Sequence, residues 1–203
     1  MHRTPRLRSG FHLQITTAAS VICDDVMPKA ITQLIDQSLA DWENKKANCQ
    51  PGEIPEAMQT GESQDDWKYW RAVTSTVTDQ DILEIETLLG VHLSPQYQEL
   101  LRHKHFVELQ IGEASIFSHP LGAWKTKIKK AVFGGWPKQF LIEKGYLPFA
   151  DYSDWGLLCF RVTEQNANGE YPVYRWDHET PEKYEYFAPD LRSALEHEAT
   201  TKA

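Results

Sequence analysis

The densest run of aromatic and β-branched residues lies near the C-terminal end of the chain, between residues 145 and 179. Residues 157–162 and 171–176 are rich in aromatic and β-branched side chains, and each segment has the length of a strand. Between them, the segment 166–169 (Asn-Ala-Asn-Gly) supplies residues that tolerate positive φ. The pattern predicts a β-hairpin. Its second arm begins irregularly or at a sheet edge, because Pro172 has no amide donor.

Apolar residues at helical spacing occur upstream of this hairpin. A first stripe follows Pro28 and consists of Ile31, Leu34, Ile35, Leu39 and Trp42. A second helix is framed by Thr78, a residue suited to the N-cap, and Gly90, which can adopt the left-handed conformation that ends a helix. Residues 48–66 are rich in Pro, Gly and acids without an apolar period, so we expect a linker or surface loop there.

Shorter patterns complete the predicted set of elements. Ser94 and Pro95 form the start signal of a third helix. The other predicted elements are strands at 73–77, 107–111, 115–117 and 184–187 and helices at 124–132, from Pro137 to Gly145, and at 189–198. Together they predict an α+β fold in which an antiparallel sheet of about five or six strands packs against helices, preceded by an accessory helix. We divide the chain into a flexible leader, accessory helix and linker (1–66) and an α+β domain (67–203).

Composition and charge narrow the function classes. Of the 203 residues, 41% are hydrophobic and 25% are charged, proportions typical of a folded globular domain. The net charge of −8 disfavours nucleic acid as a partner and favours a basic protein. The three cysteines have no C-x-x-C spacing, which fits a reducing compartment. Because no window approaches the roughly 20 apolar residues of a membrane span, we predict a soluble, cytoplasmic protein that does not enter a membrane.

The N-terminal segment loosely resembles a signal peptide, since Arg3, Arg6 and Arg8 precede a partly apolar stretch. Polar residues dilute that stretch, and no clear cleavage site follows it. We therefore favour a flexible leader or an upstream start codon, with Met27 as the start of the folded protein. The helix at 124–132 has a basic face formed by Lys125, Lys127, Lys129 and Lys130, which we interpret as a solvated face rather than an anion or nucleic-acid site.

Three segments in this order resemble the SUKH superfamily. They are DILEIETLLGVHLSPQYQELL (81–101), LPFADYSDWGLLCF (147–160) and PVYRWDHE (172–179). The likeness spans residues 78 to about 198, although residues 102–106 replace the Asn-Gly that family members often carry there. The resemblance implies a non-enzymatic protein: bacterial members are mostly immunity proteins that neutralise toxins, and fungal relatives regulate cell-wall synthesis.

Candidate chemistry in the sequence is sparse. No P-loop, dinucleotide glycine fingerprint, nucleophile elbow or metal-ligand spacing occurs, so we predict no cofactor, no metal and no catalytic residue. The most tempting cluster is Asp177-His178-Glu179. On a strand the two carboxylates would point away from the imidazole, so we favour a hydrogen-bonded turn over a catalytic site.

Three functional hypotheses follow from these observations. The leading one is an immunity protein that binds a cognate toxin domain and occludes its active site. The first alternative is a hydrolase or nucleotide-modifying enzyme built on His178 with Asp177 or Glu179, and the second is a scaffold that binds several proteins. Under the leading hypothesis, aromatic anchors ringed by acids contact a basic partner. The candidate partner-binding residues are Asp151, Asp154, Trp155, Tyr174, Trp176, Asp177 and Glu179.

Overall fold

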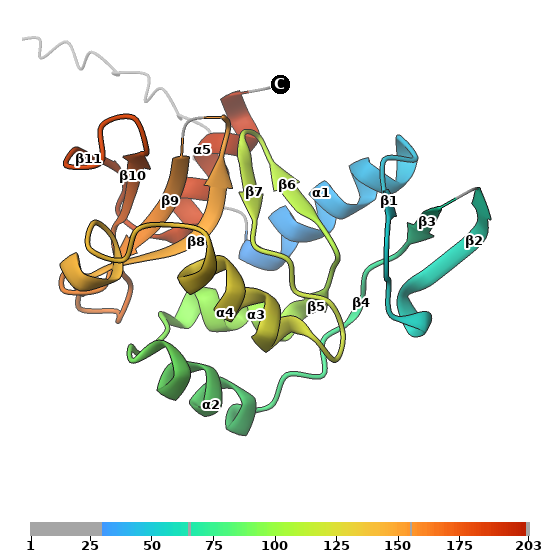
Figure 1. Ribbon diagram of the computed structural model, residues 1–203, viewed down its shortest axis with the longest axis horizontal. Coiled ribbons are helices and arrows are strands. Elements are labelled where there is room, and N and C mark those ends of the chain that lie inside the picture. Colours follow the sequence, from blue (N-terminus) through green and yellow to red (C-terminus); the bar gives the residue numbers. More distant parts are fainter. Residues whose placement is uncertain (1–29, 65, 155, 202–203) are drawn as a thin grey trace, which may run out of the picture.

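The computed structural model describes residues 30–64, 66–154 and 156–201 (Figure 1). The helices are α1 (Ile31–Asn44), α2 (Asp79–Leu89), α3 (Pro95–His103), α4 (Trp124–Gly134), α5 (Leu191–Thr201) and the short 3₁₀ segments η1 (Glu56–Met58) and η2 (Ile142–Lys144). The strands are β1 (Cys49–Pro51), β2 (Gln59–Gln64), β3 (Trp67–Trp70), β4 (Val73–Thr74), β5 (Lys104–His105), β6 (Leu109–Ile111), β7 (Ala114–Ile116), β8 (Tyr146–Tyr152), β9 (Gly156–Arg161), β10 (Val173–Asp177) and β11 (Tyr184–Ala188).

The main sheet has six strands in the order β11-β10-β9-β8-β7-β6, and every neighbouring pair is antiparallel. Each strand therefore pairs with the strands that come next to it in the chain, and the connection between β7 and β8 contains α4 and η2. The predicted α+β fold with a five- or six-stranded antiparallel sheet is confirmed. The hairpin predicted from its aromatic arms is the pair β9–β10 inside the sheet, where Val173 lies opposite Phe160.

Helices cover both faces of this sheet. Phe160 and Val173 share a face, and on that face Tyr97 of α3 packs 5.3 Å from the Phe160 ring centroid. Trp176 lies three residues beyond Val173 on β10, so its side chain points to the other face, where it meets Trp136 just after α4. Helices α1, α3 and α5 contact one another, and α4 packs on β8 (Figure 1).

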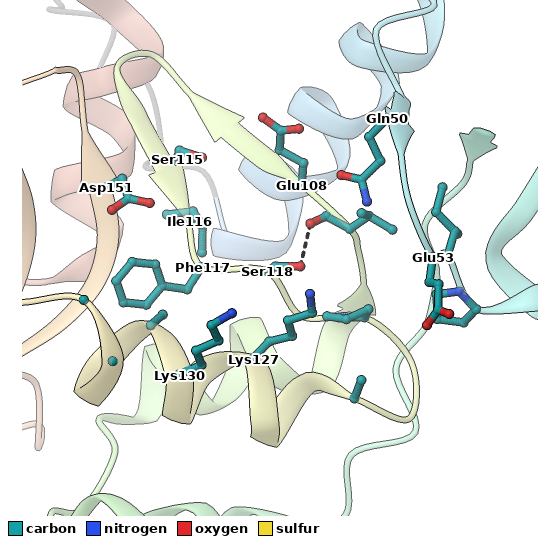
Figure 2. Close-up of a pocket in the computed structure, with 18 of the residues that line it drawn as sticks. Gln50, Glu53, Glu108, Ser115, Ile116, Phe117, Ser118, Lys127, Lys130 and Asp151 are labelled. Atoms are coloured by element: carbon teal, nitrogen blue, oxygen red, sulfur yellow. Dashed lines mark hydrogen bonds between the residues drawn. The ribbon is translucent and has the colours of Figure 1, made fainter. Parts of the chain in front are cut away.

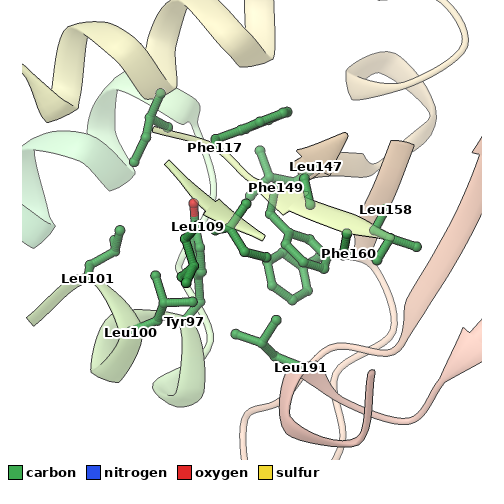
Figure 3. Packing of buried hydrophobic residues seen from close by; sticks show 14 of the residues in the cluster. Tyr97, Leu100, Leu101, Leu109, Phe117, Leu147, Phe149, Leu158, Phe160 and Leu191 are labelled. Carbon is green, nitrogen blue, oxygen red and sulfur yellow. The ribbon is translucent and has the colours of Figure 1, made fainter. Parts of the chain in front are cut away.

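The core centres on stacked aromatic rings between the sheet and α3. Phe149 and Phe160 stack at 4.3 Å between centroids and are buried, as is Tyr97 (Figure 3). Leu191 at the start of α5 reaches the same cluster. Burying aromatic and leucine side chains in this way contributes about 1.5–3 kcal/mol each, so the core fixes the position of the hairpin.

Local signals set the helix ends as predicted. The Thr78 hydroxyl accepts from the Asp81 amide (3.2 Å), and the Asp81 carboxylate accepts from the Thr78 amide (2.9 Å), which completes a capping box at α2. Gly90 ends α2 with φ of 74°, where a side chain would be strained. Ser94 caps α3, and Pro95 occupies its first turn.

The segment before Trp67 differs from the prediction. Residues 48–66 were expected to form a linker or surface loop, but β1, β3 and β2 pair as a three-stranded antiparallel sheet in that order. Its apolar residues are few and widely spaced, yet Ile54, Met58 and Trp70 are buried in the core cluster. The Trp70 amide also donates to the carbonyl of Asn48 (3.0 Å), which closes the base of this sheet. Long-range pairing therefore overrides the loop-like composition.

Helix α1 is present as predicted. Its buried residues Ile31, Leu34 and Ile35 belong to the same core cluster as the main sheet. It packs against α3, α5 and the edge strand β6. The division of the chain at residue 66 stays a prediction, and the proposed leader with Met27 lies outside the described residues.

Candidate functional site

Strand register gathers carboxylates at one end of the main sheet. Gly156 at the start of β9 lies opposite both Tyr152 of β8 and Asp177 of β10, so the β8–β9 turn and the end of β10 are neighbours. The Ser153 amide donates to the Glu113 carbonyl (3.0 Å), which adds the β6–β7 turn to the group. We call this group the acidic end; it consists of Glu113, Asp151, Asp154, Asp177 and Glu179.

The carboxylates of the acidic end have no cationic partner among the described residues. Asp177 Oδ1 accepts from the Glu179 amide (2.8 Å), the hydrogen-bonded turn expected from the sequence. Asp151 is exposed as a residue, but protein atoms near its carboxyl group displace water that would stabilise the charge, and this desolvation raises its pKa. Among the described residues, none of the five carboxylates of the acidic end forms an ion pair. A cation from outside would therefore find unpaired acceptors.

A cleft of about 870 Å³ adjoins the acidic end, and Asp151 belongs to both. The sheet wall carries Asp151, its cross-strand neighbour Ser115, and Glu108. The opposite wall is α4, from which Lys127 and Lys130 extend toward the strands (Figure 2). The small sheet β1-β3-β2 closes the third side with residues that include Gln50, Glu53 and Lys68. The volume is in the range of ligand-sized clefts.

The lysines of α4 fall into two groups. Lys125 makes ion pairs with Asp81 (2.7 Å) and with Glu84 of α2. Lys127 and Lys130 are three residues apart and therefore share one side of the helix. They line the cleft, and neither forms an ion pair with another described residue. The interpretation of the basic helix as a solvated face therefore overlooked a charged wall of a cleft.

The structure separates the predicted partner-binding residues. Asp151, Asp154, Asp177 and Glu179 come together at the acidic end. Tyr174 lies farther along β10, where it contacts Tyr146 and Tyr186 edge-on. These positions locate the side chains without testing their role in binding.

Trp176 was predicted to be an aromatic surface anchor, but its side chain is buried. Trp176 is only 1% exposed, and its indole nitrogen donates to the Pro181 carbonyl (2.9 Å), so its use as a surface anchor is wrong. Alternation along β10 turns it inward, against Trp136. Trp155 lies outside the described residues.

The Asp177-His178-Glu179 cluster does not line the cleft. Asp177 is engaged by the amide of Glu179, and the His178 ring lies 6.1 Å from the Trp136 ring. The hydrolase hypothesis needs the three side chains to converge on a substrate cavity. The arrangement described here gives that hypothesis no support.

A second pair of imidazoles lies in the interior. His105 and His119 are fully buried, with 3.1 Å between their Nδ1 atoms and stacked rings. Burial, and the repulsion that a proton on His105 would exert, lower the pKa of His119 to about 3, so the His119 imidazole is neutral at physiological pH; burial also lowers the pKa of His105. Within the described part of the chain, no three His, Cys, Asp or Glu residues are placed to hold a metal ion. None of the described helices is long and apolar enough to cross a membrane.

Comparison with known families settles the family of this chain. The model of the SMI1 / KNR4 family (SUKH-1) matches residues 76–197, more than half of the 203 residues. The chain belongs to the SUKH-1 family. A search of curated proteins found no match. Membership confirms the resemblance inferred from the sequence segments, and the SUKH superfamily includes both toxin-immunity proteins and fungal regulators.

The SUKH-1 match covers the main sheet but not the N-terminal elements of the structure. It begins just before α2 and ends within α5, so it includes the six strands of the main sheet and the lysines of α4. Helix α1 and the small sheet precede it. One wall of the cleft, with Gln50, Glu53 and Lys68, is therefore built from a part of the chain outside the SUKH-1 match.

Proposed function

We propose that this SUKH-1 protein is a non-enzymatic immunity protein of the cytoplasm, which binds a cognate toxin domain and occludes its active site. Family membership supports the class, since immunity proteins are part of the SUKH superfamily. The observation that carries the proposal is the acidic end, where five carboxylates gather without a cationic partner among the described residues. Such a surface suits a basic protein and disfavours nucleic acid.

Electrostatics favours recognition of a basic surface. The net charge of −8 attracts a positively charged domain over distances of about one Debye length, roughly 8–10 Å at physiological salt. The acidic end then focuses the approach on one part of the sheet, which raises the association rate more than the final affinity. A toxin domain that acts on nucleic acid carries such a basic surface, so covering it would block the substrate.

The aromatic contacts of the proposed interface lie farther along the sheet, on β10 and the edge strand β11. Tyr186 is 60% exposed and packs edge-on against Tyr174, with 5.7 Å between the ring centroids. Tyrosines of this kind contribute much of the binding energy in protein interfaces, because a large rigid ring is buried at small entropic cost. We assign Tyr174 of β10 and Tyr186 of β11 as anchors of the proposed interface.

Co-expression tests the proposal. The protein is produced together with the toxin domain encoded by the neighbouring gene, and survival of the host cells is measured. The proposal predicts protection by the wild-type chain and weakened protection by a variant with Asp154→Asn, Asp177→Asn and Glu179→Gln. Unchanged killing in the presence of soluble wild-type protein would contradict it. Capture of many unrelated proteins without protection would favour the scaffold instead.

A further inference from the structure

The cleft presents opposite charges on facing walls. Asp151 and Glu108 lie on the sheet side, and Lys127 and Lys130 extend from α4 toward it (Figure 2). None of these four side chains forms an ion pair with any described residue, although Lys125, two residues before Lys127, is paired with two acids. The four charges therefore line one cavity without neutralising one another.

Asp151 is exposed and Glu108 is half-buried, yet protein atoms around both carboxyl groups make their unpaired, ionised state less favourable. This desolvation raises the pKa of both Glu108 and Asp151, since fewer water molecules stabilise the ionised carboxylates. A cation beside the two carboxylates would stabilise their ionised form and lower their pKa values again. An anion beside the lysines would accept a charge-assisted hydrogen bond. An occupant that carries both charges matches the cleft better than one that carries either alone.

An extended peptide can present two opposite charges to two facing walls. Consecutive side chains of a strand point in opposite directions. A basic residue directly followed by an acidic residue would therefore present its cation to one wall and its carboxylate to the other. Two charges separated by one residue would point the same way and could match only one wall.

We propose that the cleft binds an extended segment of the partner protein in which a basic residue stands directly next to an acidic residue. The basic side chain lies beside Asp151 and Ser115, and the acidic one lies against Lys127 and Lys130. This inference rests on the proposed function, because it identifies what the partner inserts. The wall with Gln50, Glu53 and Lys68 lies outside the family match, so it adapts the shared scaffold to one partner.

A free anion or a nucleic-acid backbone fits this cleft less well. Phosphates would gain from Lys68, Lys127 and Lys130, but Glu53, Glu108 and Asp151 line the same space. These carboxylates would repel a chain of phosphates at the positions where it must lie. The equal numbers of lysines and carboxylates therefore favour a peptide of mixed charge.

Defined peptides test the cleft without knowledge of the toxin. The probes are three capped pentapeptides: acetyl-Ser-Arg-Glu-Ser-Ser-amide, its isomer acetyl-Ser-Arg-Ser-Glu-Ser-amide, and the neutral acetyl-Ser-Gln-Gln-Ser-Ser-amide. Each is titrated into the full-length ¹⁵N-labelled protein, and the amide shifts of Ser115, Ser118, Gly134 and Gly135 report on occupancy of the cleft. We expect the first peptide to bind about fivefold more tightly than either control, with saturable shifts at these amides.

Matched variants locate the contacts. Asp151→Asn and the double variant Lys127→Gln with Lys130→Gln should each weaken binding of the first peptide about threefold to fivefold. Lys125→Gln removes the same type of charge from the same helix but outside the cleft, and it should leave the affinity unchanged. Equal affinity for the isomer or the neutral peptide, no saturable shift at the reporter amides, or full binding by Asp151→Asn would each overturn the proposal. The outcome is independent of the protection assay, so failure of one does not imply failure of the other.

Discussion

Replacement of Gly156 by alanine probes the strand pairing that creates the acidic end. An added Cβ at this position would lie 2.0 Å from the Trp176 carbonyl oxygen, 3.0 Å from its carbonyl carbon and 3.2 Å from the Asp177 Cα. All three are backbone atoms of β10, so no side-chain rotation can relieve the overlap. Because Gly156 lies opposite Asp177 in the β9–β10 register, the two strands must separate at that end of the sheet.

The size of the effect follows from this overlap. Overpacking a core typically costs 1–3 kcal/mol, and a contact against backbone is at the upper end. We therefore expect Gly156→Ala to lower the free energy of unfolding by about 3 kcal/mol or more. For a chain of this length, each kcal/mol shifts Tm by roughly 2–4 °C, so Tm should fall by about 6–12 °C.

Gly135→Ala is the matched control. Gly135 follows α4 with φ of −122°, and an added Cβ meets nothing within 4 Å. The same chemical change there should leave Tm unchanged or raise it slightly, because alanine restricts the unfolded chain. The assay is thermal unfolding followed by calorimetry and by circular dichroism. Equal Tm values for Gly156→Ala and Gly135→Ala would refute the assigned β9–β10 pairing.

Three further predictions test other parts of the structure. The free energy of unfolding should be highest above pH 6.5 and should fall as the pH drops toward 5. The loss is about 1.4 kcal/mol per pH unit for each histidine that is kept neutral by burial in the folded state. His119 binds a proton near pH 6.5 in the unfolded chain, whereas burial lowers its pKa to about 3 in the folded state. Urea unfolding at pH 7, 6 and 5 measures the change in stability, and a stability that does not depend on pH would contradict the prediction. Phe149→Ala removes a buried ring stacked on Phe160 and should cost about 3–5 kcal/mol in chemical unfolding, so a loss below about 1 kcal/mol would contradict the assigned core. Lys125→Gln breaks ion pairs that are partly exposed at the surface and should change the free energy of unfolding by less than about 1 kcal/mol; a larger loss would show that α2 and α4 depend on them.

The sequence predicts those parts of the fold that local chemistry determines. Thr78 and Gly90 bound α2 because capping and positive φ are properties of a few neighbouring residues. The small sheet was missed because β1 and β3 are joined by pairing between residues such as Cys49 and Tyr69, which are distant in the chain. Buried Ile54 and Met58 are too few to produce a recognisable period.

In the candidate site, too, the sequence predicts features set by neighbouring residues but not features set by tertiary packing. The turn at Asp177 was predicted because its hydrogen bond to the Glu179 amide is local. The cleft was missed because its walls come from three separate regions, so no segment contains both Lys127 and Asp151. Trp176 was misassigned because its burial depends on Trp136, a residue of another element. Alternation along a strand shows which side chains share a face of the sheet, but tertiary packing decides which of the two faces is covered.

The association rate of the protein with the toxin domain encoded by the neighbouring gene tests the central claim most directly. It is compared among the wild type, the variant with Asp151→Asn, Asp154→Asn, Asp177→Asn and Glu179→Gln, and a control variant that neutralises four exposed acids elsewhere. The control substitutions are Asp41→Asn, Glu43→Gln, Glu56→Gln and Glu99→Gln. Both variants change the net charge equally, so only the position of the charges differs. The account predicts association about tenfold slower for the first variant than for the control at low salt, with the difference shrinking as salt increases. Equal rates for the two variants would show that the acidic end does not recognise the partner.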